Sequence, residues 1–242
     1  MQPVERTCES SSKDRLTGLN LSAENNSLLW ITGWMGLTAA ILTGAGEFLL
    51  HFDPQARFTD GLAFFEGIGE SRSTTGHFLS VVGAPLYAVG AFHIFLMLKS
   101  SSVRWALLLF MLMAYGCAVG GVWIGSRASI SAIVNSPNYA DLSHLVELYD
   151  LRYESLLQVT RFVILAISLI YVGLVAKGGS LYPRWMAVAN PIVLILLSFV
   201  VYLAAPDIGK YLMPIALNVG FTLFFCLSLY FVRQYRLADQ EG

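Results

Sequence analysis

The sequence has little charge for its length. Only 13% of the 242 residues are Asp, Glu, Lys or Arg, whereas 56% are hydrophobic. An ordinary soluble domain carries about 25% charged residues. The fifteen basic and sixteen acidic residues nearly cancel, so there is no basic field to attract a nucleic acid. This composition excludes disordered and nucleic-acid-binding proteins and is typical of a membrane protein.

Cysteine is also scarce, and its few copies are far apart. Cys8 lies in a polar N-terminal segment, and Cys117 and Cys226 lie inside apolar runs. Three cysteines in these positions cannot form a disulfide framework or a cysteine-rich metal site. Any chemistry must therefore come from other residue types.

Long apolar runs are abundant. Each is about 20 residues long, enough to cross a hydrocarbon core of roughly 30 Å at 1.5 Å per residue. We therefore expect an all-α fold, a polytopic membrane helix bundle with six transmembrane helices. It forms one domain, residues 27–232, between a polar N-terminal tail (1–26) and a short C-terminal tail (233–242). The predicted spans are 27–52, 77–98, 103–124, 156–176, 185–205 and 212–231.

The distribution of basic residues predicts the orientation. The tails and the even-numbered loops hold nine Lys and Arg residues, and the odd-numbered loops hold five. By the positive-inside rule both termini of this multi-pass protein are expected in the cytoplasm. The outer side then carries the two long loops, residues 53–76 and 125–155.

Ionisable residues near the outer ends of the spans are the main functional signal, because a charge inside a bilayer needs a partner, water or a function. Glu47 and His51 lie four residues apart on one helical face. Further along the chain, a continuous helix would place a stripe of polar residues on one arc, descending to Arg161 within an apolar run. We expect Arg161 to pair with Glu154 or Glu47. The stripe consists of His144, Glu147, Asp150, Glu154, Gln158 and Arg161.

Histidine spacing suggests a metal site. His51, His77 and His144 belong to the outer boundary, whereas His93 lies sixteen residues beyond His77, about 24 Å along a helix. His93 therefore cannot share a site with the others. Imidazoles with a nearby carboxylate can hold Zn²⁺ and leave one position for water. The candidate ligands are His77, His144 and Glu147.

Small and amide residues within the spans indicate helix packing. Pro191 and Pro85 predict local kinks, and we expect Asn218 to form interhelical hydrogen bonds. The motifs Gly116-x-x-x-Gly120 and Gly121-x-x-x-Gly125 predict close packing of the third helix, within the chain or in a homodimer.

Four stretches of the sequence carry a family resemblance: GAGEFLLHFDPQARFTD, GHFLSVVGAPLY, YPRWMAVANP and GKYLMPIALN. With them the chain resembles an uncharacterised family of bacterial integral-membrane proteins of unknown function. This resemblance implies a place in the bacterial inner (plasma) membrane. It also shows a weaker likeness to the superfamily of alkaline ceramidases and progestin-type receptors, which are intramembrane zinc hydrolases. That likeness implies a role for Ser73, four residues before His77, but the late His-x-x-x-His motif of the superfamily is absent.

These features favour an enzyme that acts on a lipid or isoprenoid-like substrate at the outer leaflet, as a hydrolase of lipid metabolism or as an isomerase or cyclase. Zinc-bound or histidine-activated water would attack the substrate, and Arg161 would stabilise negative charge. Two alternatives stay open: a small-solute transporter lined by the stripe, and an electron-transfer protein with haem held by His51 and His77. The candidate catalytic residues are Glu47, His51, Ser73, Glu154 and Arg161.

Overall fold

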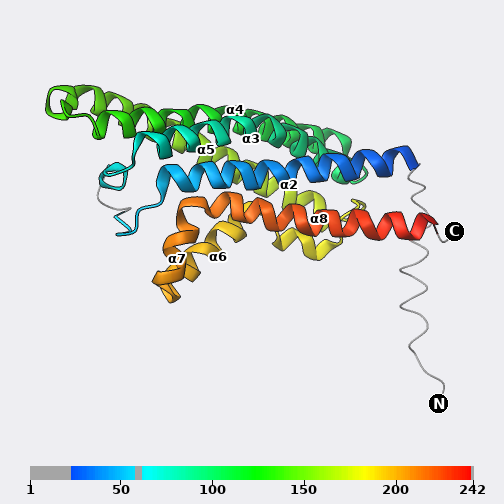
Figure 1. Ribbon diagram of the computed structural model, residues 1–242. Coiled ribbons are helices and arrows are strands. Elements are labelled where there is room, and N and C mark those ends of the chain that lie inside the picture. The colour runs from blue at the N-terminus through cyan, green and yellow to red at the C-terminus, as the bar shows by residue number, and fades with distance from the viewer. Residues whose placement is uncertain (1–22, 58–61, 241–242) are drawn as a thin grey trace, which may run out of the picture.

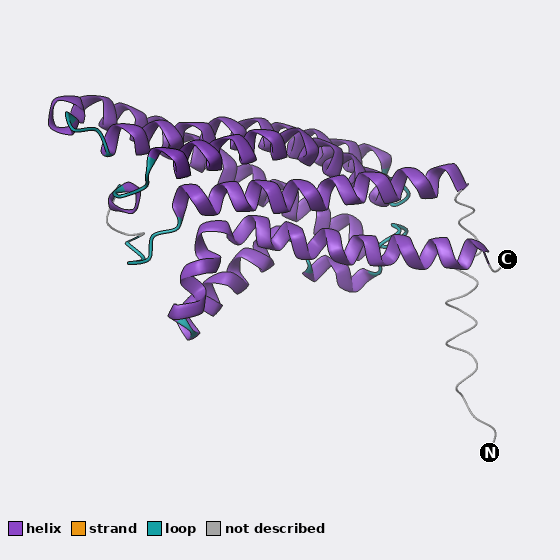
Figure 2. Cartoon of the chain, in the orientation of Figure 1, coloured by secondary structure: helices purple, strands orange, loops and turns teal. Residues whose placement is uncertain are grey.

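The computed structural model describes residues 23–57 and 62–240, and this part of the chain is helical with no strand (Figure 2). The five long helices have 25 to 35 residues. Two shorter helices and four 3-10 turns connect them. The long helices are α2 (Ala23–His51), α3 (Glu70–Leu98), α4 (Val103–Val134), α5 (Ser143–Lys177) and α8 (Ala216–Gln240), the short ones α6 (Pro191–Ala204) and α7 (Pro206–Leu212), and the turns η1 (Ala63–Phe65), η2 (Tyr139–Leu142), η3 (Arg184–Val188) and η4 (Met213–Ile215).

The predicted membrane bundle is confirmed, with one difference in the number of spans. Five helices of the described part are long and apolar enough to cross a membrane. The predicted span 185–205 instead contains the 14-residue helix α6, which is about 21 Å long at 1.5 Å per residue. Asn190 caps its start by accepting hydrogen bonds from the backbone of Ile192 and Val193, and Pro206 begins the next helix. These two signals shorten the apolar run.

The long helices lie side by side along one axis, and α6 and α7 leave the bundle at an angle (Figure 1). The first turn of α2 and the last turn of α8 lie at the same end, which we call the terminal end. The other end carries residues 52–57, residues 62–69 and the α4–α5 connection, and we call it the loop end. Residues 1–22 of the predicted N-terminal tail lie outside the described residues. The predicted C-terminal tail begins at residue 233, and α8 continues through most of it, to Gln240.

Helices α2 and α3 pack closely because small residues face each other. A side chain at Gly46 would meet the carbonyl oxygen of Gly76 at 2.5 Å, and one at Gly76 would meet the carbonyl oxygen of Gly46 at 2.7 Å. Ser80 lies at the same crossing and donates a 2.9 Å hydrogen bond to the Gly76 carbonyl. This contact fixes the register of α2 against α3 and with it the positions of Glu47 and His51.

A closed polar network lies toward the terminal end, around the fully buried His93. Thr32 donates to the Leu28 carbonyl at 2.7 Å, so its oxygen accepts from His93 Nδ1 at 3.2 Å. His93 Nε2 then accepts from Ser228 at 2.7 Å, and Ser228 accepts from the Tyr182 hydroxyl at 2.7 Å. His93 is thus separate from the other histidines, as the spacing predicts.

Candidate functional site

The loop end contains a buried ion pair between α2 and α4. Arg127 Nη1 donates to Glu47 Oε1 at 3.1 Å, and the two residues are 3% and 7% exposed. The second oxygen of the carboxylate also has a donor, because Asn218 Nδ2 donates to Glu47 Oε2. Asn218 is in turn held by the Tyr87 hydroxyl, which donates to its Oδ1 at 2.6 Å. Asn218 therefore forms the interhelical hydrogen bonds that the sequence predicts. Both oxygens of Glu47 have donors, which makes this residue an anchor for four helices.

His51 lies one turn beyond Glu47 and contacts the same guanidinium. Its Nδ1 is in contact with Arg127 Nη1. Arginine has only donors, so Nδ1 must accept, and the proton of the neutral imidazole is then on Nε2. The ring packs edge-on to Phe64, with centroids 5.4 Å apart, and to Trp123, at 6.0 Å. The arrangement makes His51 Nε2 a hydrogen-bond donor.

Aromatic rings hold the guanidinium of Arg127 in place. Its Cζ lies 3.4 Å from the centroid of Trp123, one turn earlier on α4. Trp123 in turn stacks on Tyr153 of α5, with centroids 5.3 Å apart and an angle of 20° between the planes. A cation on an aromatic face is stabilised by the ring quadrupole, most strongly where water is excluded. The stack joins α4 to α5 at the site.

A cleft of about 670 Å³ opens beside this cluster. It brings together four of the predicted catalytic residues, Glu47, His51, Glu154 and Arg161. Glu154 and Arg161 are exposed on α5, and among the described residues Arg161 forms no ion pair. The expected pair of Arg161 with Glu47 is wrong, because Arg127 occupies that carboxylate. Further residues of the lining come from η1, α4, α5, α6 and η4, among them Phe64, Trp123, Tyr153, Ile195, Phe199 and Met213.

A second cavity, of about 120 Å³, lies next to the cleft and shares part of its lining. Both cavities are lined by Glu47, Trp123, Thr160, Ile164 and Leu217. The other residues that line the second cavity are mostly apolar. It contains Ala84, Tyr87, Met113, Gly116, Cys117, Gly120, Gly121, Ile124, Val163, Ile167 and Phe221.

Glycines of α4 create this second cavity. A side chain at Gly120 would meet no atom within 4 Å, and one at Gly121 would meet only Ala84 at 4.0 Å. The expected close packing is found at Gly116, where a side chain would meet Val163 of α5 at 3.1 Å, but not at Gly120 or Gly121. Gly120 and Gly121 leave space for an apolar group between α3, α4 and α5.

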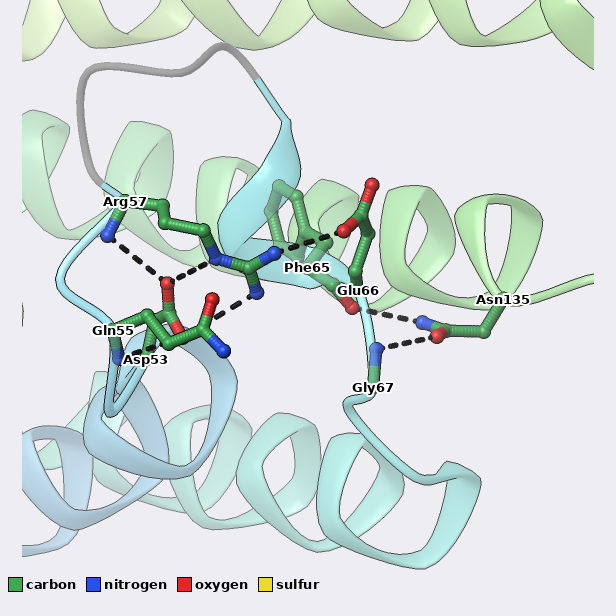
Figure 3. A network of polar contacts seen from close by, with 7 residues as sticks. All are labelled: Asp53, Gln55, Arg57, Phe65, Glu66, Gly67 and Asn135. Atoms are coloured by element: carbon green, nitrogen blue, oxygen red, sulfur yellow. Dashed lines mark hydrogen bonds and ion pairs between the residues drawn. The ribbon is translucent and has the colours of Figure 1, made fainter.

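Residues 52–57 and 62–67 form a short cap at the loop end, and polar contacts join its two parts (Figure 3). Arg57 donates to Asp53 at 2.8 Å and to Glu66 at 2.9 Å, which ties the two sides of the loop together. Asn135, just after α4, donates to the Phe65 carbonyl at 2.9 Å and accepts from the Gly67 amide at 2.8 Å. These bonds hold the fully buried Phe65 above His51, with ring centroids 6.2 Å apart.

Asp53 is the ionisable centre of this cap. Burial raises the pKa of the Asp53 carboxyl, but the hydrogen bonds from the side chain and backbone of Arg57 outweigh burial and hold the pKa below its usual value. Asp53 therefore stays charged and keeps its partners at neutral pH.

The remaining predicted site residues lie outside both cavities. Ser73 is buried on α3, His77 is half-buried one turn later, and His144 and Glu147 are exposed on the first turns of α5. Across residues 23–57 and 62–240 no group of three or more His, Cys, Asp or Glu side chains is placed to hold a metal ion. The expected zinc ligands are not brought together, and His77 does not join His51 in the cleft for haem ligation.

Arg127 is the functional residue that the sequence reasoning missed. Its position beyond the apolar run that ends at residue 124 suggested a loop charge. However, α4 continues to Val134, and Trp123, Arg127 and Ile130 lie on one face of that helix. Continued apolar periodicity around the arginine was the signal that could have placed it inside the helix.

Comparisons with known proteins give one finding. A family model described as a family of unknown function (DUF6796) matches residues 25–235. No curated protein and no solved structure matches the chain, so the weaker likeness to the ceramidase and progestin-receptor superfamily has no support.

Proposed function

Because the chain belongs to this family of unknown function, we propose a function from the geometry of its cavities. The protein is a membrane-embedded enzyme that hydrolyses an ester-type bond in a lipid or isoprenoid-like substrate. The polar part of the substrate lies in the cleft, and its apolar chain lies in the second cavity.

The observation that carries this proposal is that the two cavities are neighbours, with Glu47 and Trp123 in the lining of both. One cavity is large and bears charged side chains, and the other is smaller and mostly apolar. An amphiphile has the same two parts in the same order, and ligand sites combine apolar walls with a few placed polar groups. A water-soluble solute would leave the apolar cavity unused.

The chemistry follows from the side chains of the cleft. Glu154 is a carboxylate with access to water, and it accepts a proton from the water that attacks the ester centre. The N–H of His51 and the guanidinium of Arg161 stabilise the negative charge that develops on the substrate oxygen. The bond to the leaving group then breaks, and the proton passes from Glu154 to the departing oxygen. Glu47 positions Arg127 and His51.

A labelled-water experiment tests this function. The purified protein in nanodiscs of total bacterial lipid extract, in H₂¹⁸O, should release an acid product that contains ¹⁸O, measured by mass spectrometry. Glu154→Gln removes the proton acceptor and should slow the release by about 100-fold or more.

The matched control is Glu147→Gln, which changes an exposed carboxylate of the same helix outside the cleft. This variant should keep the rate of the wild type. Equal rates for Glu154→Gln and the wild type, or no labelled product above protein-free nanodiscs, would refute the proposed reaction.

A further inference from the structure

Three buried N–H groups at the site have no hydrogen-bond partner. They are His51 Nε2, Arg127 Nε and Trp123 Nε1. His51 and Arg127 are 7% and 3% exposed, and all three residues line the cleft. A buried donor without an acceptor costs about 1–3 kcal/mol, so a cluster of three needs an explanation.

All three groups can only donate. Indole and guanidinium have no acceptor, and His51 Nδ1 is taken by Arg127, which leaves the proton on Nε2. A ligand that satisfies them must bring several acceptors to one place and no competing donor. An ester carbonyl offers one oxygen and a carboxylate two, whereas a phosphate group offers three or four.

The position of Arg161 adds a charge to this requirement. Its neighbours Thr160 and Ile164 line both cavities, so Arg161 belongs to the junction where the polar part of an amphiphile meets its chain. Arg127 is neutralised by Glu47, whereas Arg161 has no carboxylate partner among the described side chains. An arginine at membrane depth needs a counter-charge, and a phosphate supplies one in the geometry that guanidinium prefers.

The carboxylates of the cleft favour the same place for an anion. Glu154 and Asp150 lie on α5 about 10 Å and 16 Å from Arg161 along the helix axis, at 1.5 Å per residue. Like charges repel, so a phosphate is favoured at the junction and disfavoured between these two acids.

From these contacts we infer that the substrate is a phosphorylated lipid and that the bond hydrolysed is its phosphate ester. The inference rests on the proposed function and specifies its substrate. The donors of His51, Trp123, Arg127 and Arg161 bind the non-bridging oxygens. Water adds to phosphorus, Glu154 takes the proton of that water, the bond from phosphorus to the lipid oxygen breaks, and the proton goes to that oxygen. The products are a lipid alcohol and inorganic phosphate.

Binding is tested with defined lipids. Native mass spectrometry and thermal stabilisation should show that phosphatidic acid binds more tightly than diacylglycerol or oleate in the same detergent. Trp123→Phe keeps the ring under Arg127 and removes one donor, and it should weaken the binding of phosphatidic acid about tenfold. His51→Phe should do the same. Trp105→Phe, which changes an exposed tryptophan elsewhere on α4, should leave binding unchanged.

The outcomes separate the inference from the proposed function. Inorganic phosphate carrying ¹⁸O, released from phosphatidic acid, supports both. Labelled fatty acid without labelled phosphate keeps the hydrolase and overturns the phosphate inference. Preferential binding of phosphatidic acid without any hydrolysis keeps the phosphate site and overturns the hydrolase. Equal binding of diacylglycerol, or equally tight binding of inorganic phosphate alone, overturns the lipid phosphate as the ligand.

Discussion

Two polar networks lie in the same bundle, and they differ in how completely their hydrogen bonds are satisfied. Around His93 each donor meets an acceptor, from the Tyr182 hydroxyl to the Leu28 carbonyl, and none of these residues lines either cavity. Around Arg127 three donors have no acceptor, and the network borders a cleft. The first network joins helices, and we propose that the second binds a ligand through its unpartnered donors. Buried polar residues are therefore common to both networks, and the unpartnered donors beside a cavity are what distinguish the proposed site.

The largest effect should come from breaking the ion pair of the loop-end network. Arg127→Leu leaves Glu47 buried without its cation, and we expect the free energy of unfolding to fall by about 3–5 kcal/mol. The measurement is unfolding in detergent by titration with SDS, followed by circular dichroism.

Two further variants sharpen this result. Arg161→Leu removes an exposed arginine that has no ion pair among the described residues, so it should not lower the same free energy. Glu47→Leu combined with Arg127→Leu removes both charges and should recover much of the loss. A double variant as unstable as the single one would show that the pairing is not the cause.

A smaller effect is expected at the terminal end. Ser228→Ala deprives both His93 Nε2 and the Tyr182 hydroxyl of their partner, which should cost about 2 kcal/mol of unfolding free energy. Lipid binding should not change, because Ser228 lines neither cavity.

The control is Ser168→Ala. Ser168 is equally buried, but its hydroxyl has no hydrogen-bond partner, so its removal should cost little. If Ser228→Ala stayed as stable as Ser168→Ala, or if it weakened the binding of phosphatidic acid, the distinction between the two networks would be lost.

The smallest effect should be a pH dependence that belongs to the loop end alone. The pKa of Asp53 is lower in the folded protein than in the unfolded chain. The stability it provides is therefore present above the unfolded pKa, about 3.9, and disappears as the pH falls through the folded pKa. The melting temperature of the wild type minus that of Asp53→Asn should shrink as the pH is lowered from 6 to 3. A constant difference over that range would contradict the role of Asp53 in the cap.

The sequence predicted much of the bundle and only part of the site. Long apolar runs locate α2, α3, α4, α5 and α8, because a helix that crosses the hydrocarbon core must be apolar over its length, whichever helices it packs against. The shortening of α6 depends on a cap and two prolines, which outweigh hydropathy. In the site, the cost of placing charged side chains in a membrane led us to expect that those of different spans lie together. Four of them do line one cleft: Glu47, His51, Glu154 and Arg161.

The partner of Glu47 could not be read from the sequence. The polar stripe favours Arg161, and the apolar run ends before Arg127, so only the folded structure shows that α4 continues and brings Arg127 to Glu47. The same holds for Ser73 and His77, whose spacing is suggestive but whose helix faces turn away from the cleft. Sequence periodicity defines a helix face, and the fold alone defines what that face meets.

The short helix α6 bears on how a substrate would arrive. Its residues Ile195 and Phe199 form part of one wall of the cleft, and a helix of 14 residues ends before it has crossed the roughly 30 Å of hydrocarbon. The apolar chain of a lipid substrate that approaches along α6 would stay among the acyl tails of the bilayer until it is bound. Its transfer out of water then contributes nothing to affinity, so selection between lipids falls to the polar group.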